Sequence, residues 1–393
     1  MRTSPGFLIR AALMLTLGVA NISGAALAQE APANRPEQAG GINDKPYLTN
    51  LGQGAVLGGY IDMEFEWDEN GNTFDQHRFV PFITGHVSER VTVSAEIEFE
   101  HGGNPDADGE VKIEYAVMDF MFSEGLQFRG GVVLSPLGSF NLLHDSPLND
   151  LTARPVVTRQ IIPTTLSESG MGFFGTMYPG EESVFSYQAY LVNGFDEGII
   201  TEYDDGNGGI DGKLRIRGGR GSQKADNNED KAITARAGFS PLLGTNVGLS
   251  VHSGKYDDAG NHRLTIGALD AKLTFGALEF QGEYALANAD IDREKYATAA
   301  EKQSGFYAQA NYHLLHDALM NGSVVTLVAR WDYLDYDSDR AGETEDGFTL
   351  GANFRPTEET VFKFDYNWTW VTPLEGDKGD PANRFFFSFA TYF

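Results

Sequence analysis

The last stretch of the chain, residues 383–393 (NRFFFSFATYF), changes in character at every second residue. One side of an extended chain carries Phe385, Phe387, Phe389 and Phe393, and the other carries mainly Arg384, Ser388, Ala390 and Tyr392. Alternation with a period of two is the sequence signal of a β-strand. An almost purely aromatic face suits either a strand buried in a soluble β-domain or a strand with lipid on one side and water on the other.

The same alternation runs through most of the chain. In residues 90–100, apolar Val91, Val93, Ala95, Ile97 and Phe99 oppose polar Thr92, Ser94, Glu96, Glu98 and Glu100. Counted in this way the chain contains about 16 strands, with a range of 14–18, and their connections alternate between long and short. Even strand number with long loops on one side and short turns on the other is typical of a transmembrane antiparallel β-barrel. A final strand that ends on Phe393 resembles the assembly signal of bacterial outer-membrane barrels.

The first residues predict export. Arg2 and Arg10 flank a short apolar run, and Ala26-Leu27-Ala28 has the pattern of a cleavage site, so residues 1–28 are predicted to be a secretory signal peptide. Residues 29–50 are rich in Pro, Gly and polar residues and are predicted to be a periplasmic lead-in. Residues 51–393 show no composition break and are predicted to form a single barrel domain.

Composition excludes several classes of protein. The chain has no cysteine and therefore no disulfide framework. Its net charge is −27, and −29 once the signal peptide is removed, which argues against a nucleic-acid partner because such proteins need clustered Lys and Arg. A barrel of about 16–18 strands leaves an aqueous channel. The expected partners are therefore small hydrophilic solutes or ions, outer-membrane lipid and lipopolysaccharide, and the barrel assembly machinery at the C-terminal strand.

Inward positions of the predicted strands carry the candidate pore residues, and acids outnumber bases among them. The mouth should be acidic because Glu64, Glu66, Glu98 and Glu100 fall at the outer ends of strands. Each inward charge could instead hydrate the wall or pair across strands. The predicted pore-lining and constriction residues are Arg78, Glu96, Glu98, Lys112, Glu114, Arg129, Arg154, Arg159, Arg236, Asp270, Lys272, Arg330, Lys363 and Asp365.

Residues 136–170 (PLGSFNLLHDSPLNDLTARPVVTRQIIPTTLSESG) interrupt the alternation at the position of the third outer loop. An irregular segment of this length is usually functional. We expect it to fold into the lumen and to place Arg154 and Arg159, with Arg129, against Glu96, Glu98 and Glu114. The alternative is an external cap. A second long segment, residues 193–230, is dense in Gly, Asp and Asn, and its residues 203–212 are predicted to be a flexible outer loop.

The segment from FRGGVVL (residues 128–134) through residues 135–175 resembles outer-membrane proteins grouped with the phosphate-selective porin (O/P-type) family. The resemblance spans about residues 54–195 and implies a 16-stranded, trimeric channel. Channels of that family are lined by arginine ladders and lysine clusters. Such a ladder does not match here residue by residue, so the anion- or phosphate-selective channel is an alternative to a general porin.

Enzymatic and metal-dependent functions find little support in the sequence. A barrel lipid hydrolase would need a Ser, a His and an acid placed together, and no G-x-S-x-G motif is present. Residues 203–212 (YDDGNGGIDG) are similar to a calcium loop but lack its closing acid. No catalytic residue, metal or cofactor is expected, and a structural or adhesive barrel with a blocked lumen is the remaining alternative.

Overall fold

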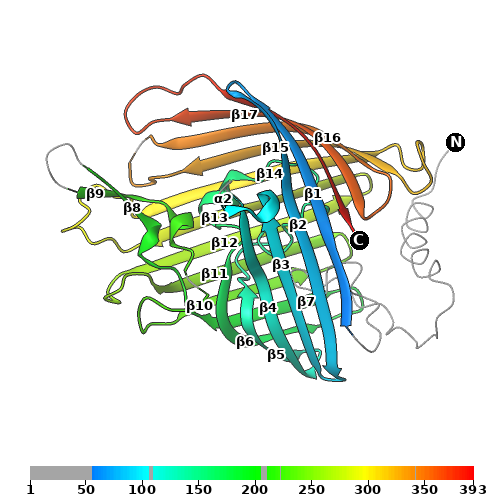
Figure 1. Cartoon of the computed structure of the whole chain (residues 1–393), viewed down its shortest axis with the longest axis horizontal. Helices are drawn as coiled ribbons and strands as arrows, with labels where there is room; N and C mark the ends of the chain where they lie inside the picture. Colours follow the sequence, from blue (N-terminus) through cyan, green and yellow to red (C-terminus); the bar gives the residue numbers. More distant parts are fainter. Residues whose placement is uncertain (1–54, 106–108, 205–209, 222, 341) are drawn as a thin grey trace. The chain divides into compact units, whose positions relative to one another are not determined.

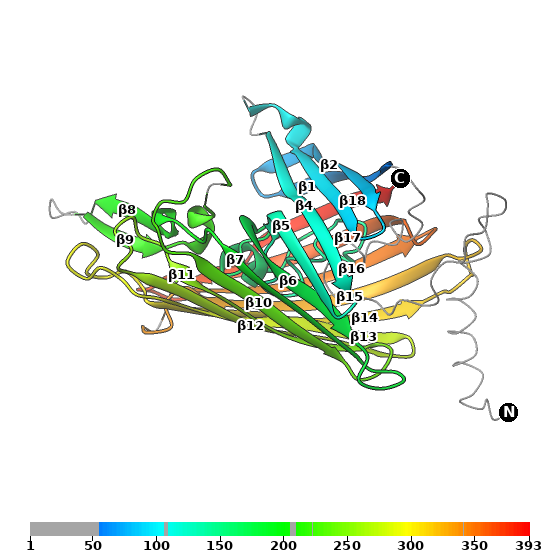
Figure 2. The same cartoon turned by 90° about the horizontal axis from the view of Figure 1, so that it is seen from below.

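A computed structural model describes residues 55–393, apart from 106–108, 205–209, 222 and 341. Sixteen of its strands close into one antiparallel barrel (Figures 1 and 2), as the sequence predicts. The signal peptide and the lead-in, residues 1–50, lie outside the described residues and stay predictions. The barrel strands are β1 (Ala55–Asp68), β2 (Gly71–Ser88), β3 (Val91–Glu100), β4 (Glu110–Ser123), β5 (Leu126–Leu134), β6 (Ser167–Met177), β7 (Val184–Val192), β10 (Ala232–Ser240), β11 (Thr245–Lys255), β12 (Arg263–Phe275), β13 (Leu278–Ala289), β14 (Lys302–Leu314), β15 (Val324–Asp335), β16 (Thr344–Arg355), β17 (Thr360–Thr372) and β18 (Ala382–Tyr392).

The C-terminal strand β18 closes the barrel against β1. Their register pairs Tyr60 with Tyr392, and the backbones of Gly59 and Phe393 exchange hydrogen bonds of 3.2 and 2.9 Å. A side chain at position 59 would collide with the carbonyl of Val80 and lie 2.8 Å from the Phe393 ring, so glycine permits this close approach. Phe393 thus joins the first strand, close to where the alternation begins.

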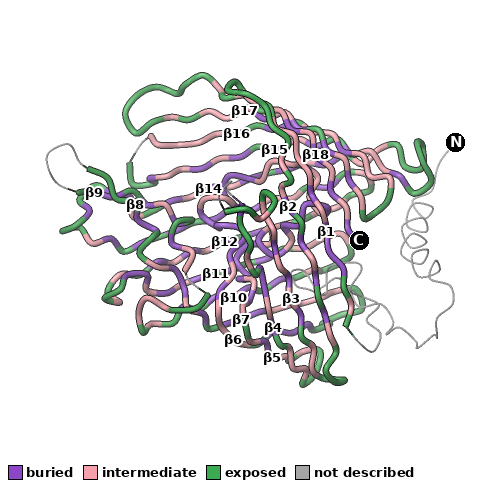
Figure 3. Tube along the Cα trace, viewed as in Figure 1, coloured by how far each residue is buried: buried purple, intermediate pink, exposed green. Residues whose placement is uncertain are grey.

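The outward face of the barrel is apolar. Buried and more exposed residues alternate along the strands (Figure 3), and large apolar side chains such as Leu249, Leu269 and Phe364 are about half exposed. Such a face suits lipid, since a closed barrel leaves no unpaired backbone group in the hydrocarbon. Within the described part of the chain, no helix has the length and apolarity of a membrane span.

The connections fall into two sets. Short turns join β2–β3, β4–β5, β12–β13 and β16–β17, and we name that end the short-turn end. The opposite, long-loop end carries the connections β3–β4, β5–β6, β7–β10, β11–β12, β13–β14, β15–β16 and β17–β18. The β1–β2 connection is short although it lies at the long-loop end, because β1 extends to Asp68 and β2 begins at Gly71.

Although proline inside a strand often marks a bulge, Pro81 stays in register with Gly59, and the register shift lies between Asp62 and Glu64. Because proline has no N–H to donate, the β2–β3 ladder is instead interrupted next to it. Residues 193–230 contain ordered structure: the 3-10 turns η6 (Glu197–Ile199) and η7 (Ile216–Gly219) flank the hairpin of β8 (Ile200–Asp204) and β9 (Ile210–Leu214).

Part of the barrel interior holds an apolar core. The β5–β6 connection contains the short helix α2 (Val156–Gln160), which packs against β13, β14, β15 and η7. Buried Val157, Ile161 and Ile162 cluster with Ile199 and Leu214 of the β7–β10 connection. Small inward side chains on the wall, Ala268, Ala285, Ala287 and Ala289, leave room for these loops. Both long connections therefore pack inside the barrel.

Candidate functional site

The inward acids of the wall hold the β5–β6 connection in place. Asp365 accepts the backbone N–H groups of Thr152 and Ala153, the latter at 3.1 Å. Glu283 accepts the N–H of Phe140 at 2.7 Å and the hydroxyl of Ser139 at 2.9 Å. Hydrogen bonds to a carboxylate are stronger than neutral ones, so these acids serve as anchors for the loop.

The inward bases of the wall hold the same connection through its carbonyl groups. Lys363 Nζ donates to the carbonyl oxygen of Ser146 at 2.8 Å, and Arg330 donates to that of Ala153 at 2.6 Å and to Asp332 at 2.8 Å. With Asp365 and Glu283, these contacts reach strands β13, β15 and β17. The loop is thus attached across a wide arc of the lumen.

A network of ion pairs joins β2, β3 and β4. Arg78 donates to Glu98 at 2.5 Å and to Glu100 at 2.7 Å, and Lys112 Nζ lies 2.6 Å from Glu98. Glu98 is fully buried, and a buried carboxylate requires such partners because desolvation of an unpaired charge is costly. Glu98 and Glu100, two of the four acids expected to give a negative mouth, are therefore neutralised here.

Two further predicted acids are buried near this network. Glu114 of β4 accepts hydrogen bonds from His144 at 2.9 Å and Thr165 at 3.0 Å, both on the β5–β6 connection. Glu96 of β3 is completely inaccessible. These acids therefore also face the loop that fills the lumen.

The remaining predicted residues lie elsewhere on the wall. Arg129 forms two hydrogen bonds of 2.8 Å with Asp119 near the β4–β5 turn, at the short-turn end, so it does not join Arg154 and Arg159. Arg236 is paired with Asp270. Lys272 lies 3.1 Å from Glu279 near the β12–β13 turn and is half exposed. These three bases are each matched by one acid.

A group of arginines comes from the two long connections. Arg154 and Arg159 lie on the β5–β6 connection, and Arg217 and Arg220 lie in and just after η7. The last two donate to the carbonyl oxygens of Thr164 and Thr165, at 2.9 and 3.3 Å. Among the described residues, Nη2 of Arg154 and Nε of Arg159 have no hydrogen-bond partner, although Arg159 lies 3.5 Å from Glu345.

The arginines influence one another electrostatically. Burial, followed by the charges of Arg220 and Arg154, lowers the pKa of the Arg217 guanidinium to about 10. The charge of Arg159 acts in the same direction. We name Arg154, Arg159, Arg217 and Arg220 the loop arginines. The sequence prediction included the first pair but missed the second, which the arginine-rich RIRGGR at 215–220 could have indicated.

The segment similar to a calcium loop is only partly within the described residues, since 205–209 lie outside them. Its Asp211 accepts hydrogen bonds from Gly212 N at 2.8 Å and Thr298 N at 3.1 Å, which ties β9 to the β13–β14 connection. Burial raises the pKa of the Asp211 carboxyl, but the hydrogen bonds from Thr298 and Gly212 outweigh it and leave the pKa lowered. Asp211 therefore has a structural role in holding the hairpin.

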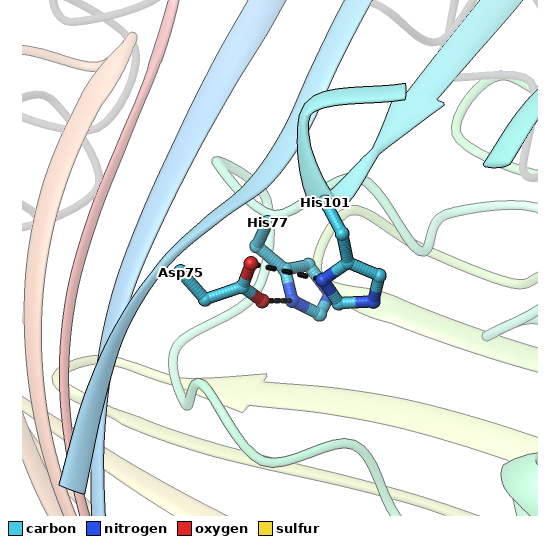
Figure 4. A group of neighbouring side chains, drawn as sticks. All are labelled: Asp75, His77 and His101. Carbon is cyan, nitrogen blue, oxygen red and sulfur yellow. Dashed lines mark hydrogen bonds and ion pairs between the residues drawn. The ribbon is translucent and has the colours of Figure 1, made fainter. Parts of the chain in front are cut away.

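Side chains that could hold a metal ion gather at a different place. Asp75 and His77 of β2 lie beside His101 of the 3-10 turn η4 (His101–Gly103), as Figure 4 shows, and Asp62 and Glu64 of β1 are close to His77. The sequence analysis expected no metal site, since these residues are separated along the chain.

Comparisons with known proteins support the fold. No protein-family model matches the chain. An uncharacterized protein of Aquifex aeolicus (strain VF5) is 27% identical over 346 residues, which make up 80% of this chain and 75% of that protein.

Several solved structures share the architecture. The anion-selective porin from Comamonas acidovorans aligns with a TM-score of 0.56 at 12% identity, covering 86% of this chain and 99% of that one. The outer membrane channel DcaP of Acinetobacter baumannii aligns with a TM-score of 0.53 at 11% identity, covering 86% and 97%. The trimer form of in-vitro folded OmpT from Vibrio cholerae aligns with a TM-score of 0.54 at 11% identity, covering 87% and 100%. The barrel is therefore porin-like in fold.

Proposed function

We propose that the protein is an outer-membrane porin that passes small hydrophilic solutes by passive diffusion and prefers anions. The porin-like barrel and its apolar outward face support a channel in the outer membrane. The similar structures include porins and an outer-membrane channel, which favours a passive channel over a barrel hydrolase. The constriction in this proposal is formed by residues 136–170, with the β7–β10 connection as its second side.

The loop arginines are the observation that carries the anion preference. Most inward charges of the wall already have partners. Acids pair with bases, as Glu98 does with Arg78 and Lys112, or accept hydrogen bonds from backbone amides of the loop, as Asp365 does. Arg217 and Arg220, by contrast, donate to neutral carbonyl groups. Of the loop arginines, Arg159 alone lies within ion-pair distance of a carboxylate among the described residues, at 3.5 Å from Glu345. Clustered guanidinium groups that outnumber the carboxylates matched to them attract anions and repel cations. This reverses the preference suggested by counting inward acids and bases in the sequence.

The expected size of the effect follows from Coulomb's law. An anion that passes about 7 Å from one arginine in water gains roughly 0.6 kcal/mol, and salt screening at about 0.1 M reduces this by about half. Each loop arginine should therefore change the ratio of anion to cation permeability by roughly twofold, since 1.4 kcal/mol corresponds to a factor of about ten.

The test is the reversal potential of the purified protein in a planar bilayer under a KCl gradient. The wild type should give the sign of an anion-preferring channel, and Arg154→Gln with Arg217→Gln should move the potential towards zero. A matched control, Arg263→Gln with Arg293→Gln, removes the same charge from exposed positions at the long-loop end and should leave the potential nearly unchanged. A cation-preferring wild type would contradict the anion preference, and absence of conductance would contradict the porin.

We further propose that the protein forms a homotrimer after cleavage of the signal peptide at residue 28. The trimer form of the similar barrel from Vibrio cholerae supports this assembly. Gel migration of unheated and heated samples tests it, because a trimer of folded barrels should run well above the single chain until it is heated. N-terminal sequencing of the mature protein should begin at Gln29.

A further inference from the structure

Five side chains of metal-binding type lie near the long-loop end of β1 and β2, in two groups that share His77. His101 Nδ1 lies 2.9 Å from Asp75 Oδ1, and His77 Nδ1 lies 3.1 Å from Asp75 Oδ2. Each oxygen of the Asp75 carboxylate thus faces one of the two imidazole rings, as Figure 4 shows. On the other side of His77, Glu64 Oε2 lies 3.5 Å from the same Nδ1 atom. Asp62 also offers a carboxylate oxygen within 4.8 Å of donor atoms on Glu64 and His77.

A β-bulge brings these residues together. The register of β1 against β2 shifts between Asp62 and Glu64, which pair with Arg78 and Asp75. Phe74 and Phe79 are both strongly exposed although they are five residues apart, which strict alternation would not allow. The extra residue between them re-aims Asp75 and His77, as bulges near functional sites often do.

The third segment of the cluster has an unusual backbone. His101 has a φ of 48°, in the left-handed region, and is followed by Gly102 and Gly103, which also have positive φ. This turn brings the His101 ring within 5.4 Å of the His77 ring, edge to face. The conformation is uncommon for a residue with a side chain, and it is what directs this imidazole towards Asp75.

The charge balance leaves the cluster in need of a cation. Arg78, the nearest base along β2, is already bonded to Glu98 and Glu100. Asp62 is only 1% exposed, and among the described residues its Oδ1 atom has no hydrogen-bond partner. A buried carboxylate oxygen without a partner is costly. Three carboxylates therefore face two imidazoles, and the nearby bases Arg78 and Lys363 share their charge with Glu98, Glu100 and Asp365.

We propose that Asp75, His77 and His101 bind one divalent transition-metal ion of the Zn²⁺ class, with Glu64 and Asp62 as nearby carboxylates beside His77. Imidazole nitrogen with carboxylate oxygen is a donor set for zinc, whereas calcium and magnesium prefer oxygen alone. Bonds of 2.0–2.2 Å in a tetrahedral site place neighbouring donor atoms roughly 3.3–3.6 Å apart, which is close to the 2.9 and 3.1 Å between the Asp75 oxygens and the nitrogens of His101 and His77.

The bound ion would connect β2 to η4 next to the bulge, which restrains the β3–β4 connection. It would also add positive charge next to the Arg78 network. Zinc should therefore both stabilise this rim and strengthen anion preference, but binding itself does not depend on transport.

The test is zinc titration of the tag-free, folded full chain in detergent, followed by calorimetry and by the visible spectrum of added Co²⁺. The wild type should bind one Zn²⁺ per chain and give the intense Co²⁺ bands of a tetrahedral site. Since loss of an outer-shell partner already costs about 10–100-fold, His77→Ala and His101→Ala should each weaken binding by about tenfold or more. The control His316→Ala removes an exposed histidine on the β14–β15 turn and should bind as the wild type does.

His101 lies outside the barrel strands and is more than a third exposed, so its replacement should leave the barrel folded, which heat-modifiable gel migration checks. Equal Zn²⁺ affinity of the wild type and the folded His101→Ala variant would overturn the proposal. So would a wild type that binds no Zn²⁺ at millimolar concentration. Either result leaves the porin proposal unaffected, because that proposal is tested by conductance in zinc-free buffer.

Discussion

Introducing two carboxylates into the apolar core inside the barrel should open the channel. Val157 of α2 and Ile161, the residue that caps its C-terminal end, are fully buried and four residues apart, so they share the face that packs on the wall. The perturbation is the double variant Val157→Asp, Ile161→Asp. It replaces two apolar side chains that contact the wall with two charges that have no partner there.

The magnitudes decide which part of the loop is released. Burial of Val157 and Ile161 contributes about 1.5–3 kcal/mol each, and leaving two unpaired carboxylates buried costs several kcal/mol more. The backbone contact from Val156 N to Asp332, at 3.1 Å, contributes only about 1.5–3 kcal/mol as a hydrogen bond to a charged group. Residues 155–161 should therefore leave the wall, whereas Thr165 should stay hydrogen-bonded to Glu114. Residues 138–153 should stay, because Asp365, Glu283, Lys363 and Arg330 hold them at separate points.

Single-channel conductance in planar bilayers measures the outcome, together with vesicle swelling in sugars of increasing size. The variant should conduct more than the wild type and admit larger sugars. The control Ala259→Asp with Ala297→Asp adds the same two charges at exposed loop positions and should change neither. A folded double variant with wild-type conductance would show that this loop does not set the pore width. A variant that no longer folds would contradict our reasoning that the closed ladder of strands is independent of the loop core.

Three further outcomes follow from the structure. The usual pKa of a guanidinium group is above 12, whereas the pKa of Arg217 is about 10. Raising the pH from about 8 to about 11 should therefore reduce the anion preference more in the wild type than in Arg217→Gln. Equal pH profiles of the reversal potential in the two proteins would contradict this. Gly138 has a φ of 71°, and a Cβ there would lie 3.0 Å from Glu283 Oε1, so Gly138→Ala should destabilise the anchored loop by about 1–2 kcal/mol in urea unfolding. The lowered pKa of Asp211 means that its stabilising effect is present above the unfolded value of about 3.9 and is lost as pH falls through the folded value. Amide hydrogen exchange of the β8–β9 hairpin, corrected for the intrinsic exchange rate, should become faster in acid in the wild type. In Asp211→Asn it should already be fast at neutral pH. Unchanged protection of the hairpin in both experiments would refute the role of the Thr298 contact.

The sequence alone was sufficient for the wall. Each strand alternates between lipid and lumen, so the period of two, the aromatic final strand and the rhythm of the loops were enough to predict sixteen antiparallel strands and their inward residues. Local alternation determines which way a side chain points, and backbone pairing in a closed barrel follows from it.

The pairing of charges was decided only by the tertiary structure. Which acid meets which base depends on register and on loops that return into the lumen from far along the chain: Glu98 meets Arg78 across the β2–β3 ladder, and Asp365 meets the amides of residues 152–153. The approach of Arg217 and Arg220 to Arg154 and Arg159, and the histidine cluster, escaped prediction for the same reason. Arg217 reaches Arg154 through the folding of two connections, and His77 reaches His101 through a bulge, and neither event leaves a periodic signal in the sequence.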